Sequence, residues 1–118
     1  MKTATELITE AKGRIREVTV DEAIRRRADD PGVLVLDVRE PNEWNLGHVQ
    51  GAQLIPRGLL ESNIEAAAPR ERSVIIYCAS GNRSALAADT MQQMGYRDVV
   101  SLRGGFRAWA EAGGPIDD

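Results

Sequence analysis

A chain of 118 residues has room for one domain, and its 42% hydrophobic and 4% aromatic content predicts a core of Val, Ile, Leu and Ala. The formal net charge of −3, with acidic and basic residues interspersed, argues against nucleic acid or an anionic membrane as a partner. The chain has one cysteine, which excludes an internal disulfide. It also has only one histidine, so there are too few ligands of these two types for a structural zinc site.

The beginning of the chain lacks the apolar run of a signal peptide, and no stretch is long and apolar enough to cross a bilayer. We therefore expect a soluble protein of a reducing, cytoplasmic compartment. A stripe of apolar residues at helical spacing then predicts an amphipathic helix over residues 3–16. The stripe consists of Ala4, Leu7, Ile8, Ala11 and Ile15.

This apolar stripe must be covered, because a short isolated helix is only marginally stable in water. It packs either on the rest of its own chain or on a partner, so both a monomer and a weak homodimer stay open. We expect residues 1–17 to form a helical extension and residues 18–118 to form the main domain.

Strands and helices alternate along the rest of the chain. Thr19 followed by Glu22 is typical of a capping box that starts a helix. The residues expected on the buried face of that helix are Val20, Ala23, Ile24 and Ala28. Uninterrupted apolar runs, typical of strands covered on both faces, follow at 33–36 and 74–77, with a weaker run at 99–102 and a short one at 53–55. Helical patterns lie between or after them at 60–68, 86–94 and 106–110, so the pattern predicts an α/β domain with a mainly parallel sheet.

The clearest candidate for chemistry is Cys78, which follows a predicted buried strand and precedes a predicted helix. Ligands of open α/β sheets bind at this end of the strands. Small residues and Gly81 allow backbone N–H groups to form an anion-binding nest, and the next helix adds its positive end. We therefore expect the pKa of the Cys78 thiol to be lowered, with Arg83 adding a positive charge suited to oxyanions.

A free cysteine at the end of a strand can also be an inert part of the core, where this residue type is often buried. The polar residues that follow Cys78 argue against this alternative, because an inert thiol needs no such loop around it. We expect Cys78 to be the catalytic nucleophile. The residues expected to bind substrate are Ala79, Ser80, Gly81, Asn82, Arg83 and Ser84.

Several short motifs follow one another along the chain. They are Leu36-Asp37-Val38-Arg39-Glu40, Glu43-Trp44, Gly47-His48-Val49 with Gly51-Ala52, Ile55-Pro56, the loop 78–84, Gly95-Tyr96 and Gly104-Gly105-Phe106-Arg107-Ala108-Trp109. In this order they resemble the rhodanese-like sulfurtransferase family, from about Val18 to the end of the chain. Trp44 stands where that family more often has Phe or Tyr, a conservative departure.

The resemblance implies a mostly parallel five-stranded sheet flanked by helices on both faces. It also implies sulfur transfer through a persulfide on Cys78, from a small anionic donor such as thiosulfate to a thiol or a sulfur-accepting protein. No metal and no organic cofactor is implied. Asp37 and Arg39 are expected to support the active-site loops, and His48 is expected to be structural, because an ionised nucleophile needs no general base.

Three alternatives remain at the level of the sequence. A persulfide carrier with little thiosulfate turnover would have the same loop. A non-catalytic binding module typically lacks the cysteine, which is present here. Phosphatases and arsenate reductases resemble the loop, but cysteine-dependent phosphatases place five residues between cysteine and arginine, whereas four separate Cys78 from Arg83. The shorter loop suits a single sulfur atom better than a tetrahedral phosphoryl group.

Overall fold

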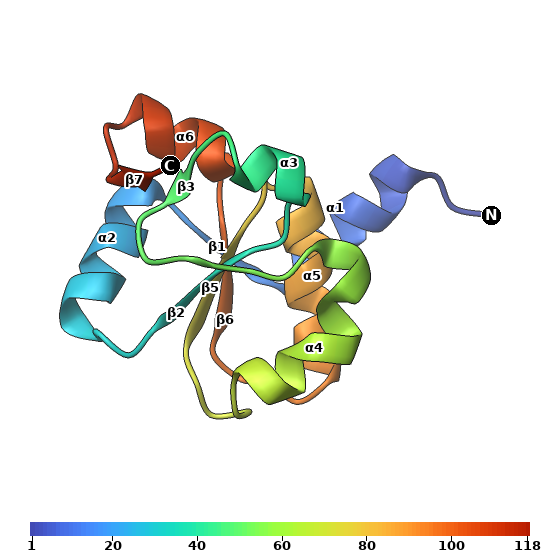
Figure 1. Cartoon of the computed structure of the whole chain (residues 1–118). Coiled ribbons are helices and arrows are strands. Elements are labelled where there is room, and N and C mark those ends of the chain that lie inside the picture. The colour runs from blue at the N-terminus through green and yellow to red at the C-terminus, as the bar shows by residue number, and fades with distance from the viewer.

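A five-stranded parallel sheet forms the centre of the computed structural model, which describes residues 1–118 (Figure 1). The strand order is β1-β6-β5-β2-β4, and every neighbouring pair runs parallel, so the carboxyl ends of the strands share one edge. The strands are β1 (Arg16–Val18), β2 (Leu34–Asp37), β4 (Gln53–Leu54), β5 (Val74–Tyr77) and β6 (Val99–Leu102).

Helices cover both faces of this sheet, which confirms the predicted fold class. One face is covered by α1 (Ala4–Arg14), α4 (Leu60–Ala67) and α5 (Asn82–Gln93), the other by α2 (Val20–Asp29) and α6 (Gly105–Glu111). The remaining elements are the short helices α3 (Pro41–Trp44) and η1 (Arg57–Leu59) and an antiparallel pair of β3 (His48–Val49) with β7 (Ile116–Asp117). None of the helices combines the length and apolar character needed to span a bilayer.

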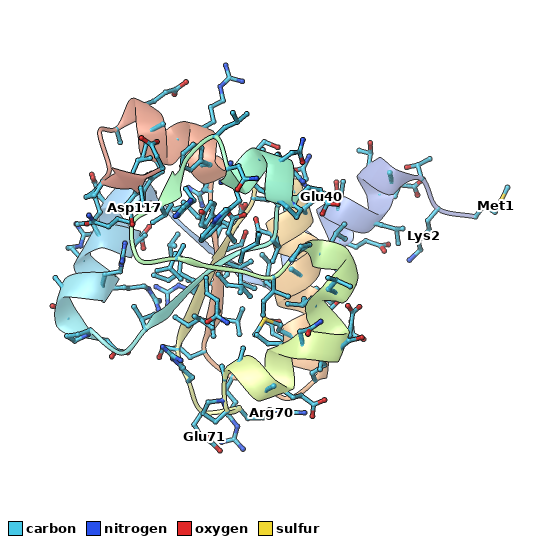
Figure 2. All side chains as sticks on the ribbon, in the orientation of Figure 1. Met1, Lys2, Glu40, Arg70, Glu71 and Asp117 are labelled. Atoms are coloured by element: carbon cyan, nitrogen blue, oxygen red, sulfur yellow. The ribbon has the colours of Figure 1, made fainter.

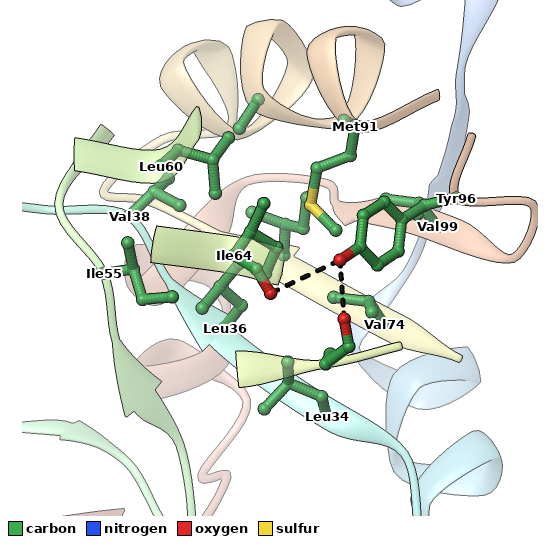
Figure 3. Packing of buried hydrophobic residues seen from close by; sticks show 14 of the residues in the cluster. Leu34, Leu36, Val38, Ile55, Leu60, Ile64, Val74, Met91, Tyr96 and Val99 are labelled. Atoms are coloured by element: carbon green, nitrogen blue, oxygen red, sulfur yellow. Dashed lines mark hydrogen bonds between the residues drawn. The ribbon is translucent and has the colours of Figure 1, made fainter. Parts of the chain in front are cut away.

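Side chains alternate between two apolar clusters, one on each face of the sheet. Leu36 and Ile76 face α4 and α5, whereas Val35 and Ile75 face α2 and α6. Figure 3 shows the first cluster, in which the hydroxyl of Tyr96 donates to the carbonyl oxygens of Ile64 and Ala68 at 3.3 and 2.6 Å. These bonds fix the end of α4 against the core. The uninterrupted apolar runs of the central strands follow from this burial on both faces.

The N-terminal helix packs on its own domain through its second half. Ala11 is fully buried, and Arg14 donates two hydrogen bonds to Asp89 of α5, at 2.9 and 2.8 Å. The first half projects away from the body, with Leu7 about half exposed. Met1 and Lys2 lie at its far tip (Figure 2). The predicted stripe is therefore only partly covered within this chain.

Three short strands have no counterpart in the predicted elements. β1, β3 and β7 are two or three residues long, too short for a pattern of alternating residues to be visible. β1 spans the boundary that we expect between the helical extension, residues 1–17, and the main domain, residues 18–118. That boundary stays a proposal. On α2, Ile24 and Ala28 are exposed although we expected them on the buried face, because only Val20 and Ala23 face the sheet.

Candidate active site

Cys78 begins the loop between β5 and α5, and its sulfur points into that loop. The Sγ atom accepts hydrogen bonds from the backbone N–H groups of Gly81 at 3.1 Å and Ser84 at 3.4 Å. It also lies 3.5 Å from the hydroxyl oxygen of Ser84. The side chain is fully buried. The loop thus forms a nest of donors around one sulfur atom, a geometry suited to a negatively charged sulfur.

These donors determine the charge state of the sulfur. Burial by itself raises the pKa of the Cys78 thiol, because it disfavours the thiolate. The hydroxyl of Ser84 and the N–H groups of Ser84, Gly81 and Ser80 act in the opposite direction and outweigh it. The pKa of Cys78 therefore lies below its ordinary value, so the nucleophilic thiolate is favoured relative to that of a free cysteine.

Ser101 of β6 supports this arrangement, and sequence reasoning missed it. Its hydroxyl oxygen lies 2.8 Å from that of Ser84, and both serines are fully buried. When the Ser84 hydroxyl donates to a thiolate, its oxygen accepts from Ser101, so the two hydroxyls form a chain that ends on sulfur. A lone serine in an apolar strand was the only signal in the sequence, and nothing there connects it to Cys78.

Two glycines allow the loop and helix α6 to approach closely. Gly81 has a φ of 105°, a left-handed conformation at the start of α5 that side chains disfavour. At Gly105 a Cβ atom would overlap the carbonyl oxygen of Cys78. The N–H of Phe106 donates to that carbonyl oxygen at 2.7 Å, and the N–H of Arg107 donates to Ala79 at 3.2 Å. The first residues of α6 therefore hold the backbone of the active-site loop.

Arg83 is paired with a carboxylate that the sequence analysis did not assign to the site. Its two terminal nitrogens donate to the two oxygens of Glu43, at 2.7 and 2.9 Å. Glu43 and, more weakly, Cys78 raise the pKa of Arg83, so the charges of Arg83 and the Cys78 sulfur do interact. The groups that act most strongly to lower the pKa of Cys78 are the hydroxyl of Ser84 and the N–H groups of Ser84, Gly81 and Ser80. Arg83 belongs to the loop 78–84, and the carboxylate of Glu43 compensates its charge.

Asp37 and Arg39 form a buried ion pair beneath the loops at this end of the sheet. Arg39 donates to both oxygens of Asp37 and to the carbonyl oxygen of Gly47 at 2.8 Å. The hydroxyl of Tyr77 donates to Asp37 at 2.6 Å and accepts from the N–H of Val49. One charged pair thus connects β2, β5 and β3. Asp37 and Arg39 contact no atom of the loop 78–84 through these bonds.

The other residues predicted for the site differ in how deeply they are buried. Ser84 is fully buried, Ala79 is half-buried, and Ser80 and Asn82 are exposed at the surface of the loop. His48 stacks on Trp44 with ring centroids 3.4 Å apart, and its Nδ1 atom lies 3.2 Å from the carbonyl oxygen of Trp44. The imidazole is therefore engaged with α3 and contributes no contact to Cys78.

Comparison with known proteins places this arrangement in a family. The family model "Rhodanese-like domain" matches residues 19–112. A sulfurtransferase of Allochromatium vinosum is 38% identical over 86% of this chain and 94% of its own length. Thiosulfate sulfurtransferase GlpE of Pseudomonas paraeruginosa is 37% identical over 71% and 76%. The probable adenylyltransferase/sulfurtransferase MoeZ of Mycobacterium tuberculosis is 44% identical over 65% of this chain, which spans only 20% of that protein.

Solved structures agree with the sequence matches. A protein of unknown function from Rhodopseudomonas palustris, described as a possible tyrosine phosphatase, is 36% identical with a TM-score of 0.89, covering 99% of this chain and 96% of its own. The polysulfide-sulfur transferase homodimer of Wolinella succinogenes is 26% identical with a TM-score of 0.83, covering 94% and 84%. The fold, the cysteine loop and these matches together show that the chain belongs to the rhodanese-like domain family.

Proposed function

We propose that this protein transfers sulfane sulfur through a persulfide on Cys78. The observation that supports it most directly is the pair of N–H groups, from Gly81 and Ser84, aimed at the Cys78 sulfur. The sulfurtransferases among its relatives make this the first activity to test. The proposed partners are a small anionic donor such as thiosulfate and a thiol or a sulfur-accepting protein.

The reaction would proceed in two displacements. The Cys78 thiolate attacks the outer sulfur of thiosulfate, the S–S bond of the donor breaks, and sulfite leaves with the electron pair. A nucleophilic acceptor, a thiolate or cyanide, then attacks the outer sulfur of the persulfide. Cys78 leaves with its electron pair as the thiolate. In both steps the N–H groups of Gly81 and Ser84 stabilise the negative sulfur.

A persulfide carrier with little thiosulfate turnover is the second candidate, because a relative is described as a putative sulfur carrier. That relative, YrkF of Bacillus subtilis, is 34% identical over 86% of this chain. A carrier would form the persulfide and pass it to a partner protein, with slow turnover from small donors. The two candidates share Cys78 and differ only in donor and acceptor.

The phosphatase alternative is less well supported, although the description of the Rhodopseudomonas palustris protein raises it. The four residues between Cys78 and Arg83 leave a nest closed on one sulfur atom, and Arg83 is engaged by Glu43. A phosphoryl group needs donors for three oxygens and a free guanidinium. We expect essentially no hydrolysis of aryl phosphates by this chain.

One experiment tests the proposed mechanism directly. Incubation with thiosulfate should add the mass of one sulfur atom to the protein, and dithiothreitol should remove it, as followed by intact-mass spectrometry. Cys78→Ser should abolish both the adduct and thiosulfate–cyanide turnover, because a serine hydroxyl is hardly ionised at neutral pH. An adduct on Cys78→Ser, or turnover close to that of the parent protein, would contradict the mechanism.

A further inference from the structure

The ion pair between Arg83 and Glu43 belongs to the surroundings of the cysteine loop, because Glu43 and, more weakly, Cys78 raise the pKa of Arg83. Arg83 is the only charged residue of the loop 78–84, and its side chain is 37% exposed. The guanidinium already holds a carboxylate in bidentate geometry, with both N–O distances below 3 Å. Bidentate pairing is the geometry in which arginine also binds sulfonate-like and phosphate-like anions, so Glu43 occupies the place of an anionic ligand.

We propose that Glu43 is a specificity-determining residue: by occupying Arg83 it disfavours the dianion thiosulfate and favours persulfide donors, which need no guanidinium. This inference rests on the proposed sulfur transfer. It identifies the class of donor as a persulfide of a small thiol or of a protein cysteine. Such a donor places its outer sulfur directly against the N–H groups around Cys78.

A second hydrogen bond holds the carboxylate of Glu43 in place beside Arg83. Its Oε1 atom also accepts the N–H of Glu40, at 2.9 Å, at the start of α3. The hydrogen bond from Arg83, which outweighs partial burial, and that from the Glu40 backbone lower the pKa of Glu43 to about 2. The carboxylate is therefore ionised throughout the pH range in which the enzyme would be assayed.

Charge repulsion adds to this competition. Thiosulfate has two negative charges and sulfonate oxygens that require donors, whereas a persulfide has at most one charge on its reacting end. To reach Arg83, thiosulfate must displace Glu43 and leave that carboxylate beside two like charges. Glu40 lies close enough that its charge also contributes to raising the pKa of Arg83. The positive charge of Arg83 is therefore compensated by Glu43 and Glu40 before a donor binds.

The test is to neutralise Glu43 without changing its shape. Glu43→Gln keeps an oxygen for the Glu40 N–H but no longer engages both guanidinium nitrogens as a carboxylate. The KM for thiosulfate should fall about tenfold, the factor that one freed charge-assisted contact typically gives. The kcat/KM for a persulfide without a carboxylate, such as cysteamine persulfide, should change less than about twofold, since that donor has no oxyanion to pair with Arg83.

The matched control is Glu40→Gln, which removes the same formal charge near Arg83 but leaves the pair intact. It should lower the KM for thiosulfate less than about twofold, as a screened surface charge does. On an Arg83→Ala background, the effect of Glu43→Gln should shrink to that of the control. A KM that stays the same or rises in Glu43→Gln would overturn the inference, because Glu43 would then merely orient Arg83.

A binding measurement separates this inference from the proposed function. On a Cys78→Ser background, which transfers no sulfur, calorimetric titration with thiosulfate should show about tenfold tighter binding when Glu43→Gln is added. Unchanged binding would overturn the role of Glu43 even if sulfur transfer is observed. Absence of transfer from both donors in the parent protein, together with tighter binding in the variant, would overturn the proposed function alone.

Discussion

At the scale of single residues, the hydroxyl chain from Ser101 through Ser84 to the Cys78 sulfur has a measurable consequence. Ser101→Ala removes the hydroxyl that donates to the Ser84 oxygen. This hydrogen bond orients the Ser84 hydroxyl so that its own hydrogen points at the Cys78 sulfur. We expect the pKa of Cys78 to rise, and the pH at which alkylation by iodoacetamide becomes fast to rise with it. The shift should be smaller than in Ser84→Ala, which removes the direct contact.

A conservative variant separates positioning from packing. Ser101→Thr retains the hydroxyl and should keep the pH profile of alkylation close to that of the parent protein. The ultraviolet absorbance of the thiolate, followed against pH, gives an independent reading of the same ionisation. Equal pH profiles for Ser101→Ala and the parent protein would show that Ser101 only fills space.

At the scale of elements, the docking of α1 depends on a pair of hydrogen bonds between Arg14 and Asp89. Asp89→Asn removes the charge and one of the two good acceptors, so α1 should detach more often from α5. Amide hydrogen exchange in residues 4–14 should accelerate, while β5 remains protected. Hydrogen exchange measured by mass spectrometry reports both segments in one experiment.

The control for this prediction is Glu111→Gln, which neutralises a carboxylate in an exposed pair with Arg107. Both side chains of that pair are largely in water, so exchange in α1 should not change. Unaltered exchange in Asp89→Asn would mean that Ala11 and its apolar neighbours hold the helix without the ion pair.

At the scale of the whole molecule, the paired carboxylates determine how stability depends on pH. The pKa values of Glu43, Asp89 and Glu22 are lowered, that of Glu43 from 4.5 to about 2. A group with a lowered pKa in the folded state stabilises fully above its unfolded value and loses this contribution as the pH falls. The free energy of unfolding should therefore decrease as the pH falls from about 4.5 to about 2.

Urea unfolding at a series of pH values tests this behaviour. In Glu43→Gln the decrease over the same pH window should be shallower, because one of the contributing carboxylates is absent. Glu111→Gln should leave the slope unchanged, since both side chains of its pair with Arg107 are largely in water. A slope in Glu43→Gln equal to that of the parent protein would contradict the role given to its pairing with Arg83.

The class of fold and the loop that carries Cys78 could both be predicted from local patterns in the sequence. Uninterrupted apolar runs such as Val74-Ile75-Ile76-Tyr77 indicate burial on both faces of a strand, and that pattern is local. Cys78 and its loop are also contiguous in the chain, so their small residues and glycine are visible without any tertiary information. The capping box of Thr19 and Glu22 was predicted correctly for the same reason.

The distant groups that surround this loop could not be predicted from the sequence. Glu43 is 40 positions from Arg83, and Ser101 is 17 positions from Ser84, so no local pattern relates either pair. Sheet pairing of β6 beside β5 places Ser101 next to the loop, and the path of α3 brings Glu43 to Arg83. Contacts between residues far apart in sequence depend on how the elements pack. Sequence periodicity indicates which residues are buried but not which residues they contact, and so the partners of Ser84 and Arg83 became visible only in the folded chain.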